Sequence, residues 1–267
     1  MERKARVIVV AALAAWWVAA SGAAWAQSTG SAATDGAGRG IAALDAAARG
    51  GKHLFIFFWK DDNEQAARMY GVFESGVKAL SASADAVAVR ITDPRETALV
   101  KRYDVDRAPM PLVLAIAPNG AVTRAFPAEF NAEQLRAALV SPCTARCMKA
   151  LQDRKWVVLC VVNAQTQFAQ EAWRGAAEFR ADARFAQAAE LVPLDPSDPN
   201  EAEFLQALRV DPATTQAVTL LLAPPGQVVA RLTGAVSKDQ LAASAAASRT
   251  GCCPGGTCGP KGCGPTK

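Results

Sequence analysis

The sequence predicts an α/β protein with two successive domains, each a mixed sheet flanked by helices. Unbroken apolar runs alternate with segments of helical periodicity, and the same order of elements occurs twice. A length of 267 residues suits two domains of ordinary size. With 51% apolar and 20% charged residues, the composition is that of a folded globular protein.

The first 26 residues are typical of a secretory signal peptide. Basic residues within the first six positions precede an apolar run, Val7–Ala20, and Ala24–Ala26 supplies the small residues of a cleavage site. An uncleaved membrane anchor is the alternative, because the apolar stretch approaches the about 20 residues that span a bilayer. We expect an exported protein, periplasmic or extracellular, with a flexible spacer over 27–40.

The net charge argues against a nucleic-acid or anionic-membrane partner. It is +4 for the whole chain, and the expected signal peptide supplies +2 of that. The remaining bias is too weak for such a partner, and the basic residues are scattered.

The first domain is predicted over 41–141. Its expected elements are a helix at 41–48, a strand at His53–Trp59, a helix at 64–80, a strand at 86–91, a helix at 96–103, a strand at 112–116, a turn at 118–120, a strand at 121–126 and a helix at 132–140. The run HLFIFFW is almost wholly apolar, which is consistent with a central strand covered on both faces.

The second domain is predicted over 142–247, with a linker helix at its start. After that helix we expect a strand at 156–162, a helix at 167–187, a strand at 190–194, a helix at 201–208, strands at 218–222 and 228–232, and a helix at 238–247. Gly120 corresponds to Gly226 and Leu135 to Leu241, so the repeat is visible in the numbering.

Two motifs in the first domain resemble the thioredoxin superfamily. Phe58-Trp59 is similar to the Phe-Trp at the end of that family's central strand. The loop 107–111, followed by an apolar strand and Pro-Asn-Gly at 118–120, is similar to the family's cis-proline loop, strand and turn. The resemblance implies two tandem thioredoxin-like domains and makes Pro111 the candidate cis-proline.

The resemblance also implies where catalytic cysteines would lie, and neither copy has them. In the first copy the two positions are Asn63 and Ala66, and in the second they map near Gln167 and Gln170. The second copy has Ala217 in place of the cis-proline. Because dithiol exchange needs an activated thiolate and a resolving thiol, we expect no such activity at either site.

A non-catalytic domain of this family holds a peptide or protein partner near the cis-proline loop. The resemblance therefore assigns partner binding to Trp59, Met110 and Pro111. This is the favoured function, and it requires no cofactor.

Cys143 and Cys147 are expected at the start of a helix capped by Ser141 with Pro142 at its first position. Both sulfurs would lie on one face, and the helix N-terminus and Arg146 would favour a thiolate at Cys143. A local disulfide, two packed thiols, thiol–disulfide exchange and a metal relay all remain open. The spacing also occurs in copper-delivery proteins that resemble thioredoxin, whose further histidine ligand has no counterpart here.

A cysteine-rich tail is expected over 248–267. Its thiols are Cys252, Cys253, Cys258 and Cys263, separated mostly by Gly and Pro, which build no core and leave the backbone disordered. Four thiolates on such a segment suit a soft ion, Cu(I) or Zn²⁺, while two disulfides are the alternative in an oxidising compartment. Metal binding or delivery is thus a second functional hypothesis.

Three other features are expected to be structural. Cys160 lies within an apolar strand, and His53, the only histidine, starts another. The acidic residues Asp61, Asp62 and Glu64 fit helix capping and the helix dipole.

Overall fold

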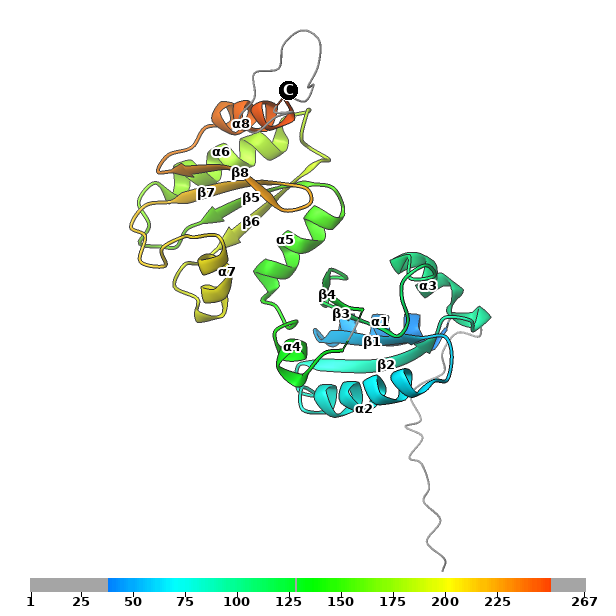
Figure 1. The fold of residues 1–267 in the computed structure, drawn as a ribbon. Coiled ribbons are helices and arrows are strands. Elements are labelled where there is room, and N and C mark those ends of the chain that lie inside the picture. The colour runs from blue at the N-terminus through cyan, green and yellow to red at the C-terminus, as the bar shows by residue number, and fades with distance from the viewer. Residues whose placement is uncertain (1–37, 128, 251–267) are drawn as a thin grey trace, which may run out of the picture. The chain divides into compact units, whose positions relative to one another are not determined.

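The computed structural model describes residues 38–127 and 129–250. These residues form two four-stranded mixed sheets, each with its own flanking helices (Figure 1). The expected signal peptide, most of the spacer and residues 251–267 of the cysteine-rich tail lie outside the described residues. Residues 248–250, which were predicted to belong to the tail, instead continue the last helix. Among the helices that are described, none combines the length and apolarity needed to cross a membrane.

The first domain has the predicted order of elements. Its helices and strands are α1 (Arg39–Arg49), β1 (His53–Trp59), α2 (Glu64–Lys78), β2 (Ala84–Arg90), the 3-10 turn η1 (Pro94–Glu96), α3 (Thr97–Tyr103), β3 (Leu112–Ile116), β4 (Val122–Phe126) and α4 (Ala132–Arg136). The strand order is β2-β1-β3-β4, with β1 parallel to β2 and antiparallel to β3.

Strand β1 is apolar throughout because both of its faces are covered. Leu54, Ile56 and Phe58 pack in the core beneath α1 and α3. Phe55 and Phe57 pack in the other core, with residues of α2 and α4. Alternate residues of one strand thus serve two cores.

The second domain repeats this plan. It consists of α5 (Pro142–Gln152), β5 (Trp156–Val161), α6 (Ala169–Ala181), β6 (Ala189–Leu194), η2 (Pro199–Glu201), α7 (Ala202–Ala207), β7 (Val218–Ala223), β8 (Gln227–Thr233) and α8 (Lys238–Thr250). The strand order β6-β5-β7-β8 matches that of the first sheet. Helix α5 therefore corresponds to α1, and it packs against β5 as the first helix of its own domain.

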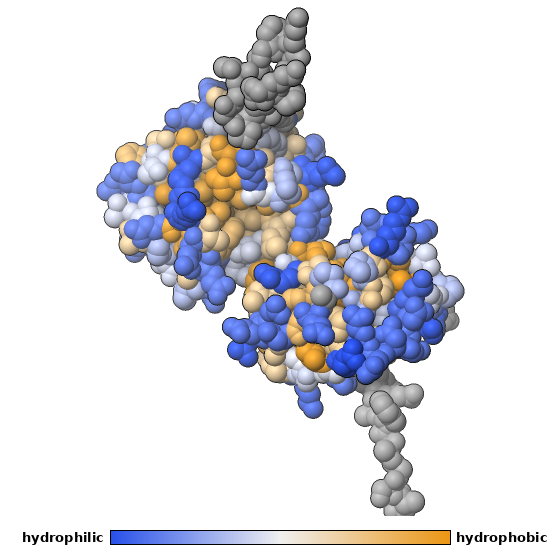
Figure 2. Space-filling view, viewed as in Figure 1, coloured by the Kyte–Doolittle hydropathy of each residue, from blue (hydrophilic) through white to orange (hydrophobic). Residues whose placement is uncertain are grey.

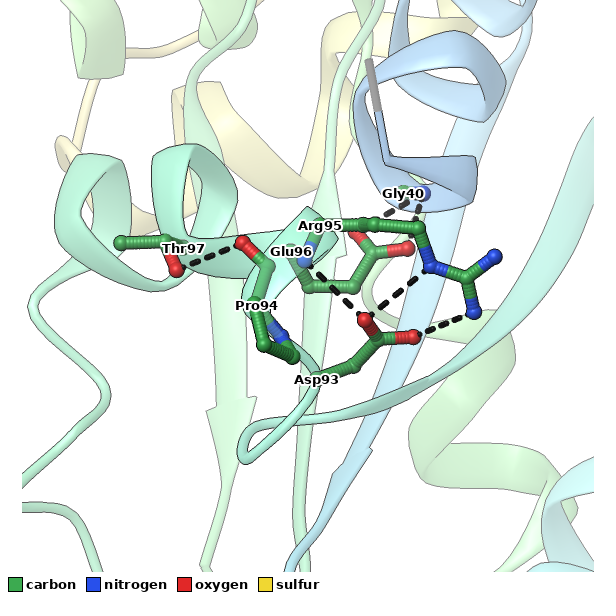
Figure 3. Close-up of polar contacts among 6 residues, drawn as sticks. All are labelled: Gly40, Asp93, Pro94, Arg95, Glu96 and Thr97. Carbon is green, nitrogen blue, oxygen red and sulfur yellow. Dashed lines mark hydrogen bonds and ion pairs between the residues drawn. The ribbon is translucent and has the colours of Figure 1, made fainter. Parts of the chain in front are cut away.

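A repeated turn motif, which the sequence analysis missed, secures the first helix of each domain. Each 3-10 turn reads Asp-Pro-x-Glu, at 93–96 and 198–201. Figure 3 shows the first copy: Asp93 accepts the N–H of Arg95, and the carboxylate of Glu96 accepts the N–H of Gly40 in α1 at 3.1 Å. Glu96 and Glu201 are both only 4% exposed, so each domain buries one carboxylate at the N-terminus of its first helix.

Two predicted helices are shorter than expected. The helix predicted at 167–187 is α6, which begins at Ala169 and ends at Ala181. Its end is fixed by Asp182, whose side chain accepts the N–H of Arg184 and turns the chain. The helix predicted at 132–140 ends as α4 at Arg136.

Candidate functional site

The site begins where β1 ends and α2 starts. Asn63 is the N-cap of α2, and its side-chain oxygen accepts the N–H of Ala66 at 2.8 Å. The two positions where the resemblance places catalytic thiols are thus joined by a hydrogen bond from the Ala66 backbone to the Asn63 side chain. The expectation that Asp61 and Asp62 serve as caps is wrong, because the amide of Asn63 holds that place; Glu64 does lie in the first turn.

The loop before β3 faces this helix start. The Met110–Pro111 peptide bond is cis, as the resemblance implied, and Pro111 is buried while Met110 is half-buried. A cavity of about 290 Å³ lies between the loop and the start of α2. Its lining includes Trp59, Asn63, Ala66, Met110 and Pro111, so the structure brings the three predicted partner-binding residues together.

Met110, which lines this cavity, has an unusual backbone. Within the described part of the chain, neither its N–H nor its C=O has a hydrogen-bond partner. Backbone groups that are left unpaired at the surface are ready to bond to an extended segment of another chain. The loop therefore offers one donor and one acceptor beside a half-buried apolar side chain.

Arg90 holds Trp59 in place, and no sequence signal pointed to it. Its guanidinium lies 4.8 Å from the centroid of the Trp59 ring, and its Nε donates to the carbonyl of Lys60 at 3.3 Å. The two residues face each other because Trp59 and Arg90 are register partners in the parallel β1–β2 ladder.

The corresponding region of the second domain is closed by hydrogen bonds. The N–H of Gln167 donates to the C=O of Thr215, and the N–H of Ala217 donates to the C=O of Gln167, both at 2.9 Å. The N-cap of α6 is Phe168, so the position equivalent to Asn63 is one residue after the predicted Gln167. Gln216, the counterpart of Met110, thus lies between two residues that are hydrogen-bonded to Gln167, and its C=O accepts from Thr214 Oγ1 at 2.8 Å.

Cys143 and Cys147 are two packed thiols on α5. Both are free in the structure; Cys147 is buried and Cys143 is half-exposed. The thiol of Cys143 donates to the carbonyl of Pro193 at 3.4 Å. Contact with the Cys143 side chain, together with burial, raises the pKa of Cys147 well above its usual range, so Cys147 stays protonated.

The groups that were expected to act on Cys143 have other partners in the structure. The buried carboxylate of Glu201 accepts hydrogen bonds from Ser141 Oγ, at 2.8 Å, and from the N–H of Cys143. The guanidinium of Arg146 donates instead to Glu190 and to the carbonyl of Leu191, each at 3.2 Å. The N–H of Cys143 and the guanidinium of Arg146 are thus both hydrogen-bonded to groups other than the Cys143 sulfur.

The remaining candidates have structural surroundings. Cys160 is fully buried in β5, and burial raises the pKa of its thiol to about 11. His53 accepts the N–H of Val140 through Nε2 at 3.4 Å. Over the described ranges there is no cluster of three or more side chains that could hold a metal ion. The four tail cysteines lie outside those ranges.

Comparison with known proteins gives structural neighbours only. No protein-family model matches the sequence, and no curated protein matches it. StoA from Bacillus subtilis is 18% identical over 33% of this chain and 82% of its own, with a TM-score of 0.27. The zinc-bound form of human ERp44 is 11% identical over 79% of this chain and 59% of its own, with a TM-score of 0.33.

A third neighbour also covers both domains. The first two thioredoxin domains of Naumovozyma dairenensis Eps1p are 9% identical over 78% of this chain and 95% of their own, with a TM-score of 0.29. The repeated strand order and the cis-proline loop of the first domain are the features on which the fold assignment rests. On these features, the described part of this chain consists of two domains of thioredoxin-like fold.

Proposed function

We propose that the first domain binds an extended segment of a protein or peptide partner at the loop around Pro111. The observation that carries the proposal is the open backbone of Met110, beside Trp59 and above a cavity of about 290 Å³. The proposal makes the protein an exported, non-catalytic binding module.

The same geometry argues against dithiol exchange at this site. Asn63 and Ala66 are bonded to each other at the helix start, and neither side chain forms a covalent bond with a partner disulfide. Binding would then rest on hydrogen bonds and apolar contact alone, and it would not depend on thiols.

Peptide selection followed by titration tests this function. Dodecapeptides selected on the purified chain by phage display would be labelled and titrated by fluorescence anisotropy against the chain and its variants. We expect Met110→Asp to weaken binding about tenfold or more, because it places a charge beside the open backbone groups.

Two controls separate loop binding from binding elsewhere on the chain. Val72→Asp introduces the same charge at an exposed position of α2 outside the cavity and should leave affinity unchanged. Alkylation of the accessible thiols with iodoacetamide should also leave it unchanged. Peptides that bind Met110→Asp as well as the wild-type chain, or that bind only through free thiols, would contradict the proposal.

A second candidate is thiol–disulfide exchange by Cys143 and Cys147. It is favoured by the contact between the two side chains and by the partial exposure of Cys143. The pair would give two electrons and two protons to a partner disulfide and itself become a disulfide. Insulin reduction that is lost in Cys143→Ser would support this candidate, and no reduction by the wild-type chain would remove it.

Binding of a soft metal by the tail is a separate proposal that rests on sequence alone. About one Cu(I) or Zn²⁺ per reduced chain is expected, since four thiolates complete one tetrahedral site for zinc. Deletion of 251–267 should abolish it, while Met110→Asp should not affect it. Native mass spectrometry of both variants measures the result, and metal retained after the deletion would refute the proposal.

A further inference from the structure

A groove runs between α2 and the edge strand β2 of the first domain. Two cavities, of about 560 and 400 Å³, share Tyr70 and Ala88 in their linings. The strand lines the groove with alanines at 84, 86 and 88 and also with Asp85 and Val87, while α2 contributes aromatic rings. The small alanine side chains of β2 leave space beside the aromatic rings of α2. Tyr70 is 39% exposed.

The outer edge of β2 is unpaired along the same groove. The N–H of His53 donates to Ser83 O, and the N–H of Ile91 donates to Trp59 O, so odd-numbered residues of β2 turn their backbone groups toward β1. The N–H and C=O of Ala86 and Ala88 therefore point outward. Among the described residues, no strand or side chain is bonded to them.

In the second domain the equivalent edge is blocked at each corresponding position. Leu191 and Pro193 of β6 stand where β2 has Ala86 and Ala88, and the proline has no N–H. The carbonyl of Leu191 accepts from Arg146, and that of Pro193 accepts from Cys143. Counted from the helix N-cap, Arg146 and Cys143 of α5 correspond to Ala43 and Gly40 of α1. Neither alanine nor glycine has a side chain that could bond to the edge of β2.

We propose that the edge of β2 binds an extended peptide as an added strand, with large apolar side chains of that peptide filling the groove. An added strand bonds to the outward groups of Ala86 and Ala88 and sends alternate side chains toward α2. This site is distinct from the Met110 loop and does not depend on it.

Charge at the groove defines the peptide further. The linings contain four carboxylates, those of Asp62, Glu64, Glu74 and Asp85, and one ammonium, that of Lys78. Arg68 pairs with Glu64 and Lys52 pairs with Asp85, which leaves the two carboxylates of Asp62 and Glu74 against Lys78. A basic peptide therefore fits better than an acidic one. In Figure 2, apolar residues are interspersed with charged ones over the face of the first domain that carries α2 and β2.

The test uses a defined probe and a backbone variant. The probe is a fluorescein-labelled peptide, Lys-Val-Thr-Phe-Thr-Val-Lys, with apolar residues at alternate positions and basic ends. Ala86→Pro removes an outward N–H without touching the ladder to β1, and proline is tolerated at such an edge. We expect Ala86→Pro to bind the probe about tenfold more weakly, while Ala86→Ser, which keeps the N–H, binds as the wild-type chain does.

Three further measurements separate strand addition from nonspecific binding and from binding at the loop. Ala88→Leu fills the groove without altering the backbone and should weaken binding similarly, which keeps the test valid if the proline variant does not fold. A probe with proline in place of both threonines should not bind. Met110→Asp should bind the first probe normally, so failure of this site is distinguishable from failure of the loop site.

Two results would overturn the proposal. One is equal binding of the probe by the wild-type chain, Ala86→Pro and Ala88→Leu, or no binding by any of them. The other is a wild-type dimer that becomes monomeric in Ala86→Pro, measured by analytical ultracentrifugation, because the edge would then belong to a second copy of the chain.

Discussion

The two domains share one fold but differ in what they leave open. In the first, the backbone groups of Met110 and the outward groups of Ala86 and Ala88 in β2 have no partners within the described residues. In the second, Gln167 bonds to the equivalent loop, and Arg146 and Cys143 bond to the equivalent edge. The difference shows that a domain can keep its strand order while a few side chains decide whether its surfaces remain available.

The largest expected effect is a change in stability caused by substituting a glycine in α6 of the second domain, compared with one in the equivalent helix α2 of the first. A Cβ atom at Gly175 in α6 would lie 1.9 Å from the backbone oxygen of Val236, whereas one at Gly71 in α2 would meet nothing within 4 Å. Gly175→Ala should therefore destabilise the second domain by about 3 kcal/mol. Gly71→Ala should stabilise the first by about 0.5–1 kcal/mol. Urea unfolding of both variants measures the contrast, and equal effects would break it.

A smaller effect is expected from restoring the proline that the second domain lacks. Ala217→Pro removes the N–H that donates to Gln167 and should cost about 0.5–1.5 kcal/mol, since one intramolecular hydrogen bond is lost. It should not create a binding site, because Gln167 still donates to Thr215. Unfolding and peptide titration of this variant would show the cost without new binding; tight binding would mean that the missing proline alone closes the loop.

The smallest effect is a difference in pH dependence between the domains from pH 7 to pH 5. Burial lowers the pKa of His53 in the first domain, and burial raises the pKa of Glu201 in the second. As pH falls below the ordinary histidine value, the unfolded state takes up the His53 proton first, so the first domain loses stability. In the second domain the folded state protonates Glu201 first, so stability rises as pH falls toward the ordinary glutamate value.

Hydrogen exchange followed by peptide mass spectrometry resolves the two domains in this experiment. Protection in β1 should fall on acidification, while protection in β5 should hold or increase, after correction for intrinsic exchange. His53→Gln, which keeps a side-chain acceptor, should remove the loss in β1. A parallel fall in both strands would contradict the assignment to these two groups.

Local signals were sufficient for most of the secondary structure. His53–Trp59 and Leu112–Ile116 were predicted to the residue, because continuous apolar runs bounded by glycine, proline or charged residues leave little freedom in placing a strand. The helix predicted at 167–187 was too long, since the alanine-rich sequence continues helical periodicity past Asp182, where a side-chain bond turns the chain.

The candidate site was predictable only where family motifs marked it. Trp59, Met110 and Pro111 were identified by resemblance, and the structure brings them to one cavity. The buried carboxylates of Glu96 and Glu201 were missed although Asp-Pro-x-Glu occurs twice, because a glutamate in a polar turn gives no sign of burial. Arg90 was missed because its contact with Trp59 depends on strand register.

By itself the sequence determined the two-domain α/β plan, the absence of cysteines at both family positions and the place of the cis-proline loop, since these depend on residue type and local periodicity. Only the tertiary structure decided that Gln167 bonds to the cis-proline-equivalent loop of the second domain and that Arg146 and Cys143 bond to its sheet edge, while Met110, Ala86 and Ala88 lack such partners among the described residues. Closure depends on hydrogen bonds between residues far apart in the chain, such as Gln167 with Thr215 and Arg146 with Leu191. Folding must first bring these groups within bonding distance, and no local pattern records which of them meet.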